Sequence, residues 1–366
     1  MTRGLSWRNF DFLLLGAIVL ATAFGVAMIR SAVAGNDQLT PLVSRQAYFA
    51  IGGLVAIFLI AAIDYHYWLA LYRPIYLVTM ILLIALFLSA QAVFGAARWF
   101  QVGVLFVQPT EFAKIVVILI LARYFDTTQN DARNIPWLVR AFLWVFFLMI
   151  WILLQPNLSN VIVIMVIFFA MLWINGLDLR QLLMIAGSIL VLAFIAFPFL
   201  QPYQQARVIN FVVPQGNVNY GATYNVQQAL IAIGSGGLFG KGYGHGTQTQ
   251  LRFLKVRHTD FIFSATAEEF GMVGAILVIV VEIFIVWRCI RAAQKARDLA
   301  GSMIAYGVAI LLFFQGMANI AVNLKLIPVS GLPLPFISYG GSGLASLMLG
   351  VGLVESVVMR HKPLEF

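Results

Sequence analysis

The fold follows from one stretch, residues 262–287, which reads IFSATAEEFGMVGAILVIVVEIFIVW. This largely apolar run is longer than the roughly 20 residues that carry a helix across a bilayer. A polar segment without Asp or Glu, residues 201–259, precedes it, and Asp260 stands at the border between the two. The sequence therefore predicts a membrane-spanning helix that begins directly after a large loop.

Nine further apolar runs have comparable length. All ten lie near residues 11–31, 46–63, 73–90, 109–125, 137–154, 158–175, 181–199, 262–287, 302–324 and 338–358. Charged residues make up 10% of the 366-residue chain, against about 25% in a soluble domain. We therefore expect a single all-α, polytopic membrane domain over residues 1–366. It has about ten transmembrane helices, with a large loop, about residues 201–260, between the seventh and the eighth.

Lys and Arg residues predict the orientation of the chain. An even number of helices puts both termini on one side, and the connections on that side carry most of the basic residues. By the positive-inside rule, both termini are then cytoplasmic. The large loop faces outward although it carries Arg207, Lys241, Arg252, Lys255 and Arg257. A basic outer loop favours a phosphate-bearing partner.

Three outer segments are irregular and rich in glycine, proline or aromatic residues: residues 91–108, the large loop and residues 325–337. Irregular backbone at membrane depth is tolerated where it is buried in protein or lines a cavity. We therefore expect these segments to share one cavity that opens outward.

Asp260 is the leading candidate for chemistry, because a single acid at the edge of a basic loop suits a general base. Two alternatives stay open. Asp260 is also a favourable residue for capping the helix that follows, and the neighbouring His258 is a rival base.

The fourth apolar run opens with residues 108–114, QPTEFAK. Glu111 and Lys114 are three residues apart, so they share a helix face and can pair. Ionisable groups inside a membrane segment are costly and indicate substrate binding, although a structural ion pair also explains them. Arg98, beside Trp99, adds a cation at the outer surface, where a plain aromatic interface anchor is the alternative.

Residues 234–242, GSGGLFGKG, have some features of a nucleotide-binding phosphate loop. Five residues rather than four separate Gly234 from Gly240, and no Ser or Thr follows Lys241, so nucleotide binding is not expected. The turn either presents N–H groups to an anion or needs glycine for its backbone angles. Residues 328–342, PVSGLPLPFISYGGS, place Ser338 at the start of the last helix, where an anion can bind.

These motifs resemble the SEDS family of bacterial cell-wall proteins (shape, elongation, division and sporulation). The similarity is carried by residues 108–114, 227–242, 258–263 and 328–342 and covers nearly the whole chain. Gly246, Thr247 and Gln248, with Leu251, are more similar to the RodA branch of the family than to the FtsW branch.

The resemblance implies a peptidoglycan glycosyltransferase that polymerises lipid II outside the membrane for cell elongation and shape. It also implies a class B penicillin-binding protein as transpeptidase partner. The family's catalytic aspartate corresponds to Asp260, its membrane acid and base to Glu111 and Lys114, and an arginine to Arg98. The chain departs from the family at three positions: Asn157 replaces an Asp, and Lys255 and Val256 replace Pro and Glu.

We expect inverting transfer from an undecaprenyl-diphosphate-linked glycan to a hydroxyl of lipid II. Asp260 takes the proton, and a set of cationic and polar groups holds the diphosphate: Arg98, Arg207, Lys241, Arg257 and Ser338. No certain cofactor is indicated and no metal-binding motif is present, but a divalent cation such as Mg²⁺ or Mn²⁺ stays open. Nucleic acid is not an expected partner.

Two other functions stay open, a lipid II transporter and a non-catalytic scaffold for a penicillin-binding protein. For a partner's single helix we expect a docking surface of small residues, because membrane helices associate by close packing. The candidates are Gly271, Gly274, Ala275, Ala305 and Ala309.

Overall fold

The computed structural model describes residues 7–90, 99–102, 105–155, 157–199, 205–206, 208–209, 211 and 222–360. Its helices are α1 Phe12–Val33, α2 Pro41–Ala62, α3 Tyr65–Ala70, α4 Tyr72–Ala90, α5 Pro109–Thr127, α6 Ile135–Leu154, α7 Leu158–Ile174, α8 Leu179–Ala196, α10 Ala222–Gly236, α11 Thr247–Gln250, α12 Ile262–Lys295, α13 Leu299–Asn323 and α14 Gly341–Val358. Two 3₁₀ turns, η1 Trp7–Asn9 and η2 Phe197–Phe199, and two strands, β1 Phe100–Val102 and β2 Leu105–Val107, complete the described chain.

All ten predicted apolar runs are helical, so the all-α membrane fold is confirmed. Among the described residues, seven helices are long and apolar enough to cross a membrane: α1, α2, α4, α6, α12, α13 and α14. Helix α7 is shorter, at 17 residues, and α5 carries several charged residues along its length. The antiparallel pair β1–β2, with Phe100 opposite Val107, was not predicted, because three-residue strands leave no periodic signal.

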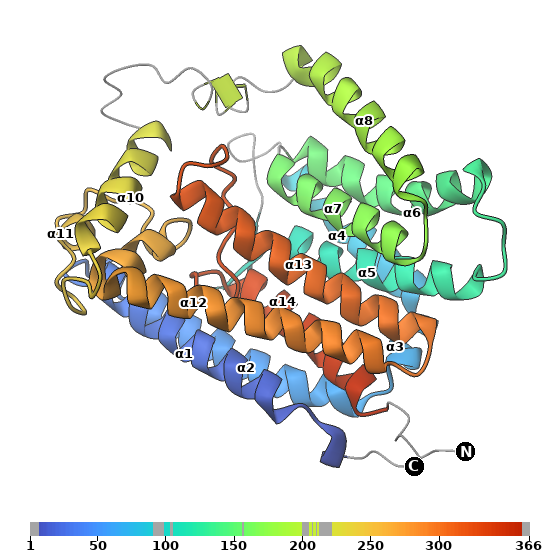
Figure 1. The fold of residues 1–366 in the computed structure, drawn as a ribbon, viewed down its shortest axis with the longest axis horizontal. Coiled ribbons are helices and arrows are strands. Elements are labelled where there is room, and N and C mark those ends of the chain that lie inside the picture. The colour runs from blue at the N-terminus through green and yellow to red at the C-terminus, as the bar shows by residue number, and fades with distance from the viewer. Residues whose placement is uncertain are drawn as a thin grey trace.

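The centre of the bundle is formed by α13 and α14. Helix α14 packs against α2, while α13 packs against α12, α5 and α7. Glycines allow these helices to approach closely: a Cβ atom at Gly307 would lie 2.6 Å from Ile118, and one at Gly352 would lie 2.8 Å from Ile60. Figure 1 shows α1 and α2 along one side of the bundle and α4 to α7 along the other, while α8 projects away.

The predicted helix over residues 262–287 is interrupted. Gly271 lies inside α12 with φ 67° and ψ −163°, outside the helical region. The glycine-rich turn after α10 inserts there, and the N–H of Met272 donates to the carbonyl of Gly237 at 2.9 Å. A Cβ at Gly271 would come within 2.4 Å of the backbone of this turn, so only glycine fits. The break therefore joins the large loop to the helix that follows Asp260.

Residues near the two ends of the described chain meet at one end of the bundle. The N–H of Asp11 donates to Glu355 at 2.9 Å, and Arg288 pairs with the Asp11 carboxylate at 2.5 Å. This arrangement agrees with an even number of crossings. The segments expected to face outward lie at the opposite end.

Candidate functional site

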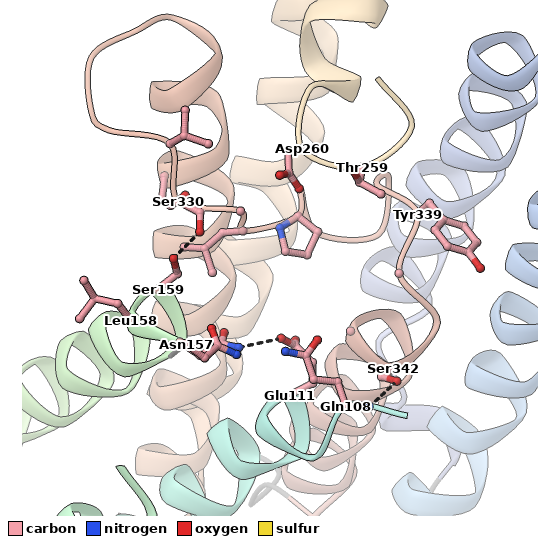
Figure 2. A pocket seen from close by; sticks show the side chains of 18 of the residues that line it. Gln108, Glu111, Asn157, Leu158, Ser159, Thr259, Asp260, Ser330, Tyr339 and Ser342 are labelled. Carbon is pink, nitrogen blue, oxygen red and sulfur yellow. Dashed lines mark hydrogen bonds between the residues drawn. The ribbon is translucent and has the colours of Figure 1, made fainter. Parts of the chain in front are cut away.

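A cavity of about 720 Å³ lies at the end of the bundle opposite Asp11. Its described lining comes from every expected outer segment: Trp99, Phe106, Gln108, Val208, Thr259, Asp260 and residues 327–333, joined by residues 157–160 and 339–343. Figure 2 shows Asp260 and Glu111 on opposite sides of this space. The structure thus brings the irregular segments together as predicted.

Three charged side chains line the cavity among the residues that the structure describes: Arg45, Glu111 and Asp260. Uncharged polar residues such as Ser159, Ser330 and Tyr339 also line it. A second part of the wall is apolar and includes Phe49, Phe106, Ile162, Phe314 and Ile327. A cavity with both kinds of wall suits an amphiphilic ligand that has a charged head and an apolar chain.

Asp260 is not the N-cap residue of α12. The N-cap position is Phe261, whose own side chain makes no capping hydrogen bond. Asp260 thus precedes the N-cap position that the alternative gave it, and its carboxylate lines the cavity. A Cβ at Gly331, which has φ +72°, would lie 3.8 Å from Asp260 Oδ2, so the proline-rich loop, residues 328–337, runs close to this carboxylate.

His258 is not among the cavity-lining residues. Burial, and then the charge of the adjacent Arg257, lowers the pKa of the His258 imidazole. His258, the alternative candidate for the base, therefore lies behind the part of the cavity wall that carries Asp260.

Ser338 has a structural position rather than a ligand-facing one. Its hydroxyl donates to the carbonyl of Thr259 at 2.7 Å and accepts the N–H of Leu334 at 2.9 Å. The side chain is buried and does not line the cavity. Ser338 thus fastens the proline-rich loop to the segment that carries Asp260.

Glu111 and Lys114 pair as predicted, with Lys114 Nζ 2.7 Å from Glu111 Oε2. Lys114 is fully buried and also donates to Gln315 Oε1 at 3.2 Å. Glu111 faces the cavity and accepts from Asn160 Nδ2 at 3.4 Å. The acid therefore belongs to the wall, and the lysine supports it from behind.

Lys241 lies away from the cavity lining. Its ammonium group contacts Glu268 Oε1 at 3.0 Å, Ser235 Oγ at 2.8 Å and Thr247 Oγ1 at 2.7 Å. The N–H groups of Lys241 and Gly242 donate to main-chain carbonyls of α12, so they are not presented to an anion. The arrangement favours the structural interpretation of the glycine-rich turn.

Arg257 also lies outside the cavity lining. It is buried, and its guanidinium donates to the carbonyls of Ala32 and Leu254. Arg98 and Arg207 fall outside the described residues. Their sequence neighbours Trp99 and Val208 line the cavity.

Arg45, in the first turns of α2, is the cavity-lining cation that the sequence did not reveal. Burial raises the pKa of the Tyr339 hydroxyl, and the guanidinium charge of Arg45 lies close enough to oppose part of this rise. The next residue, Gln46, donates to the Ser338 carbonyl and accepts the N–H of Gly340, both at 3.2 Å. The sequence signal that could have identified Arg45 is its place in the first turns of a helix that follows a connection expected to face outward.

The three positions that depart from the family pattern differ in their surroundings. Asn157 lines the cavity. The carbonyl of Val256 accepts the N–H groups of Thr259 and Phe261, both at 3.3 Å, whereas the Lys255 side chain is exposed. Of the three positions, Asn157 is therefore the one placed to contact a ligand in the cavity.

A metal site made by protein side chains alone is not present in the described part of the chain, where no group of three or more His, Cys, Asp or Glu residues could hold an ion. Glu111 and Asp260 are the described carboxylates at the cavity.

Comparisons with known proteins agree with this architecture. The family model for FtsW, RodA and SpoVE, described as "Cell cycle protein", matches residues 7–363. The chain is 35% identical over 352 residues to peptidoglycan glycosyltransferase MrdB of Escherichia coli K12, covering 95% of this chain and 93% of the relative. It is 34% identical over 371 residues to a probable peptidoglycan glycosyltransferase FtsW of Hydrogenovibrio crunogenus, covering 97% and 95%. These values do not separate the two branches.

Solved structures show the same fold. A chain from a peptidoglycan synthase complex, described as coordinating polymerization and crosslinking, aligns with TM-score 0.79 and 28% identity over 96% of this chain and 98% of that one. The rod shape determining protein RodA of Thermus thermophilus aligns with TM-score 0.73 and 27% identity over 98% and 99%. This chain therefore belongs to the FtsW/RodA/SpoVE family, the SEDS family that its motifs indicated.

Proposed function

We propose that this protein is a peptidoglycan glycosyltransferase that polymerises lipid II on the outer face of the cytoplasmic membrane, for cell elongation and shape. The observation that carries the proposal is the Asp260 carboxylate on the wall of a cavity with both charged and apolar sides. Relatives named peptidoglycan glycosyltransferase span nearly the whole chain and support it.

In the proposed reaction, a hydroxyl oxygen of lipid II attacks the anomeric carbon of the donor glycan. The bond from that carbon to the diphosphate breaks, and its electron pair leaves with the diphosphate. Asp260 accepts the hydroxyl proton as the new bond forms. Attack from the face opposite the leaving group inverts the anomeric configuration.

Negative charge develops on the departing diphosphate and needs a cation. Arg45 is the described basic residue at the cavity and fits this role. Arg98 and Arg207 remain proposed partners of the diphosphate. Lys241 and Arg257 are engaged elsewhere, and we no longer assign them to it.

A divalent cation is compatible with the donor set at the cavity. Mg²⁺ typically takes one or two carboxylates and fills its remaining positions with phosphate oxygens and water. Glu111 or Asp260 would supply the carboxylate, and the ion would supply further positive charge beside the diphosphate.

We further propose a class B penicillin-binding protein as partner and an orientation with both termini cytoplasmic. The similar chain from a synthase complex that combines polymerization and crosslinking supports such a partnership. The predicted docking surface of small residues is wrong in part. Ala305 and Ala309 are buried inside the bundle, and Gly271 is buried at the break in α12.

The test uses purified protein and labelled lipid II, with glycan length read on a gel. Long glycan from the wild-type protein is the expected result. Translocation of lipid II across vesicle membranes without any glycan would indicate the transporter. The absence of both activities would leave the non-catalytic scaffold as the remaining function.

A further inference from the structure

Two asparagines of α13, Asn319 and Asn323, lie one turn apart and are almost fully buried, with 1% and 0% exposure. Both donate from Nδ2 to the same acceptor, the main-chain carbonyl of Asp260, at 3.0 and 2.9 Å. A carbonyl oxygen has two lone pairs. The two amides therefore satisfy this acceptor completely.

Asn319 also joins two walls of the cavity. An amide group carries two N–H donors, and the second one of Asn319 reaches the carbonyl of Leu332 at 2.8 Å. Leu332 belongs to the proline-rich loop that lines the cavity. One side chain thus sets the spacing between this loop and the segment that carries Asp260.

Asn323 fixes the start of the next helix. Its Oδ1 accepts the N–H of Ser264 at 3.1 Å and the hydroxyl of Ser264 at 2.5 Å. Its amide also donates to the carbonyl of Asn319 at 2.9 Å. The first turn of α12, the Asp260 carbonyl and α13 are therefore held by one side chain.

The carbonyls on the other side of this segment are held as well. The N–H of Tyr339 donates to the carbonyl of His258 at 2.9 Å, and Ser338 Oγ donates to that of Thr259 at 2.7 Å. Three successive carbonyls, ending at Asp260, are thus bound by groups from α13 and the segment before α14. A side chain on such a backbone projects from a fixed point.

We propose that Asn319 and Asn323 are positioning residues that set the Asp260 carboxylate for proton transfer. The inference rests on the proposed function, because it concerns the geometry of the base in that reaction. A displacement of about 1 Å in a reacting group can cost on the order of 10²-fold in rate. The hydrogen bonds that the two asparagines make to the described cavity wall go to main-chain carbonyls, those of Asp260 and Leu332.

The test compares Asn319→Ala and Asn323→Ala with Ser264→Ala. The serine belongs to the same buried network, but its hydroxyl does not contact the Asp260 carbonyl. Initial rates are measured against lipid II concentration and divided by the amount of folded protein. For the asparagine variants we expect kcat to fall on the order of 10²-fold with KM within about twofold, since the base acts only in the transition state. Ser264→Ala should melt earlier and keep the wild-type kcat.

A second variant guards against poor folding. Asn319→Gln keeps both amide donors on a longer side chain, so its kcat should lie between those of wild type and Asn319→Ala. Wild-type kcat per folded molecule in both alanine variants, with active wild-type protein, would overturn the positioning role and leave the proposed function standing. Absence of any glycan from the wild-type protein would overturn the proposed function and this inference with it.

Discussion

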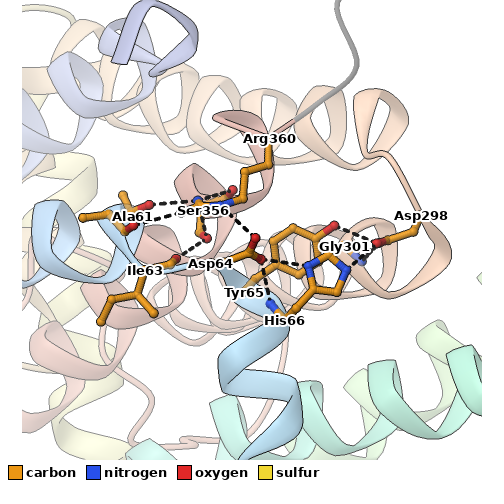
Figure 3. Close-up of polar contacts among 10 residues, drawn as sticks. Ala61, Ile63, Asp64, Tyr65, His66, Asp298, Gly301, Ser356 and Arg360 are labelled. Carbon is orange, nitrogen blue, oxygen red and sulfur yellow. Dashed lines mark hydrogen bonds and ion pairs between the residues drawn. The ribbon is translucent and has the colours of Figure 1, made fainter. Parts of the chain in front are cut away.

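The two ends of the bundle use their charged residues differently. At the end that we expect to face outward, the outer end, Arg45, Glu111 and Asp260 line a cavity. At the opposite, inner end, a cluster of side chains around His66 and Arg360 forms hydrogen bonds at the ends of four helices (Figure 3). The contrast separates charges that serve the fold from charges that are presented to a ligand.

The inner cluster satisfies backbone groups that helices leave unpaired at their ends. Arg360 donates to the carbonyls of Ala61 and Ala62 at the end of α2, at 3.0 and 2.9 Å. Ser356 donates to the carbonyl of Ile63 at 2.7 Å. Ser356 in the last turn of α14 and Arg360 just after that helix thus cap the end of α2.

Acids of the same cluster cap helix starts. Asp298 accepts the N–H of Gly301 at 2.7 Å at the start of α13, and Asp64 accepts the N–H of His66 at 2.9 Å at the start of α3. The ring nitrogens of His66 lie 2.8 Å from both acids and join the two caps. These side chains have a structural task that accounts for their charge, whereas no such task accounts for Arg45 at the cavity.

The largest effect on stability is expected at the Glu111–Lys114 pair, which combines both kinds of role. Removing one partner of a fully buried pair leaves an uncompensated charge, at a cost of about 3–5 kcal/mol. Glu111→Gln and Lys114→Met should therefore each melt at lower temperature than the double variant. Thermal unfolding of the four proteins measures the coupling, and strictly additive losses would show that the pair does not form.

A substitution of Arg45 tests whether a charge at the outer end acts on the ligand. Arg45→Gln should lower the polymerisation rate on the order of 10²- to 10³-fold, as loss of one donor to a developing anion does in other enzymes. The matched control is Lys255→Gln, which removes an exposed charge that does not line the cavity. Equal rates for the two variants in the lipid II assay would remove Arg45 from the diphosphate site.

A substitution of Arg360 tests whether a charge at the inner end serves the stability of the fold. Arg360→Met leaves the carbonyls at the end of α2 without their donors, at a cost of about 1–3 kcal/mol. The melting temperature should fall, while polymerisation per folded molecule stays at the wild-type value. A loss of rate as large as that of Arg45→Gln would break the distinction between the two ends.

The smallest effect is a pH dependence from His258. Its pKa is lowered in the folded protein by burial and by Arg257, so the unfolded chain binds this proton first as pH falls. Stability is therefore lost as pH falls below about 6.5, the ordinary pKa of the imidazole. His258→Gln should flatten the decline in melting temperature between about pH 7.5 and pH 5. An unchanged slope would contradict the burial of the neutral ring.

Local sequence predicted what depends on local signals. The apolar runs gave the helices, and the spacing of Glu111 and Lys114 gave their pairing, which the structure confirms. The break at Gly271 was hidden, because the apolar pattern continues through it and the turn that fills it comes from before Asp260.

Roles that depend on distant partners could not be predicted in this way. Lys241 and Arg257 stand in the basic loop, but Glu268 and the carbonyl of Ala32 bind them away from the cavity. Arg45 reaches the cavity because α2 packs against α14, beside Tyr339, a contact that no local pattern indicates. The packing of distant segments decides which of the similar cations faces the ligand.

The central claim is that Asp260 is the base of glycan polymerisation, and its neutral isostere tests it most directly. Purified Asp260→Asn is compared with wild type and with Asp37→Asn, which removes an exposed acid from another outer connection. We predict that Asp260→Asn lowers the rate of glycan formation by on the order of 10²- to 10⁴-fold, with an unchanged melting temperature and full activity in Asp37→Asn. Long glycan made by Asp260→Asn at near the wild-type rate would contradict the account.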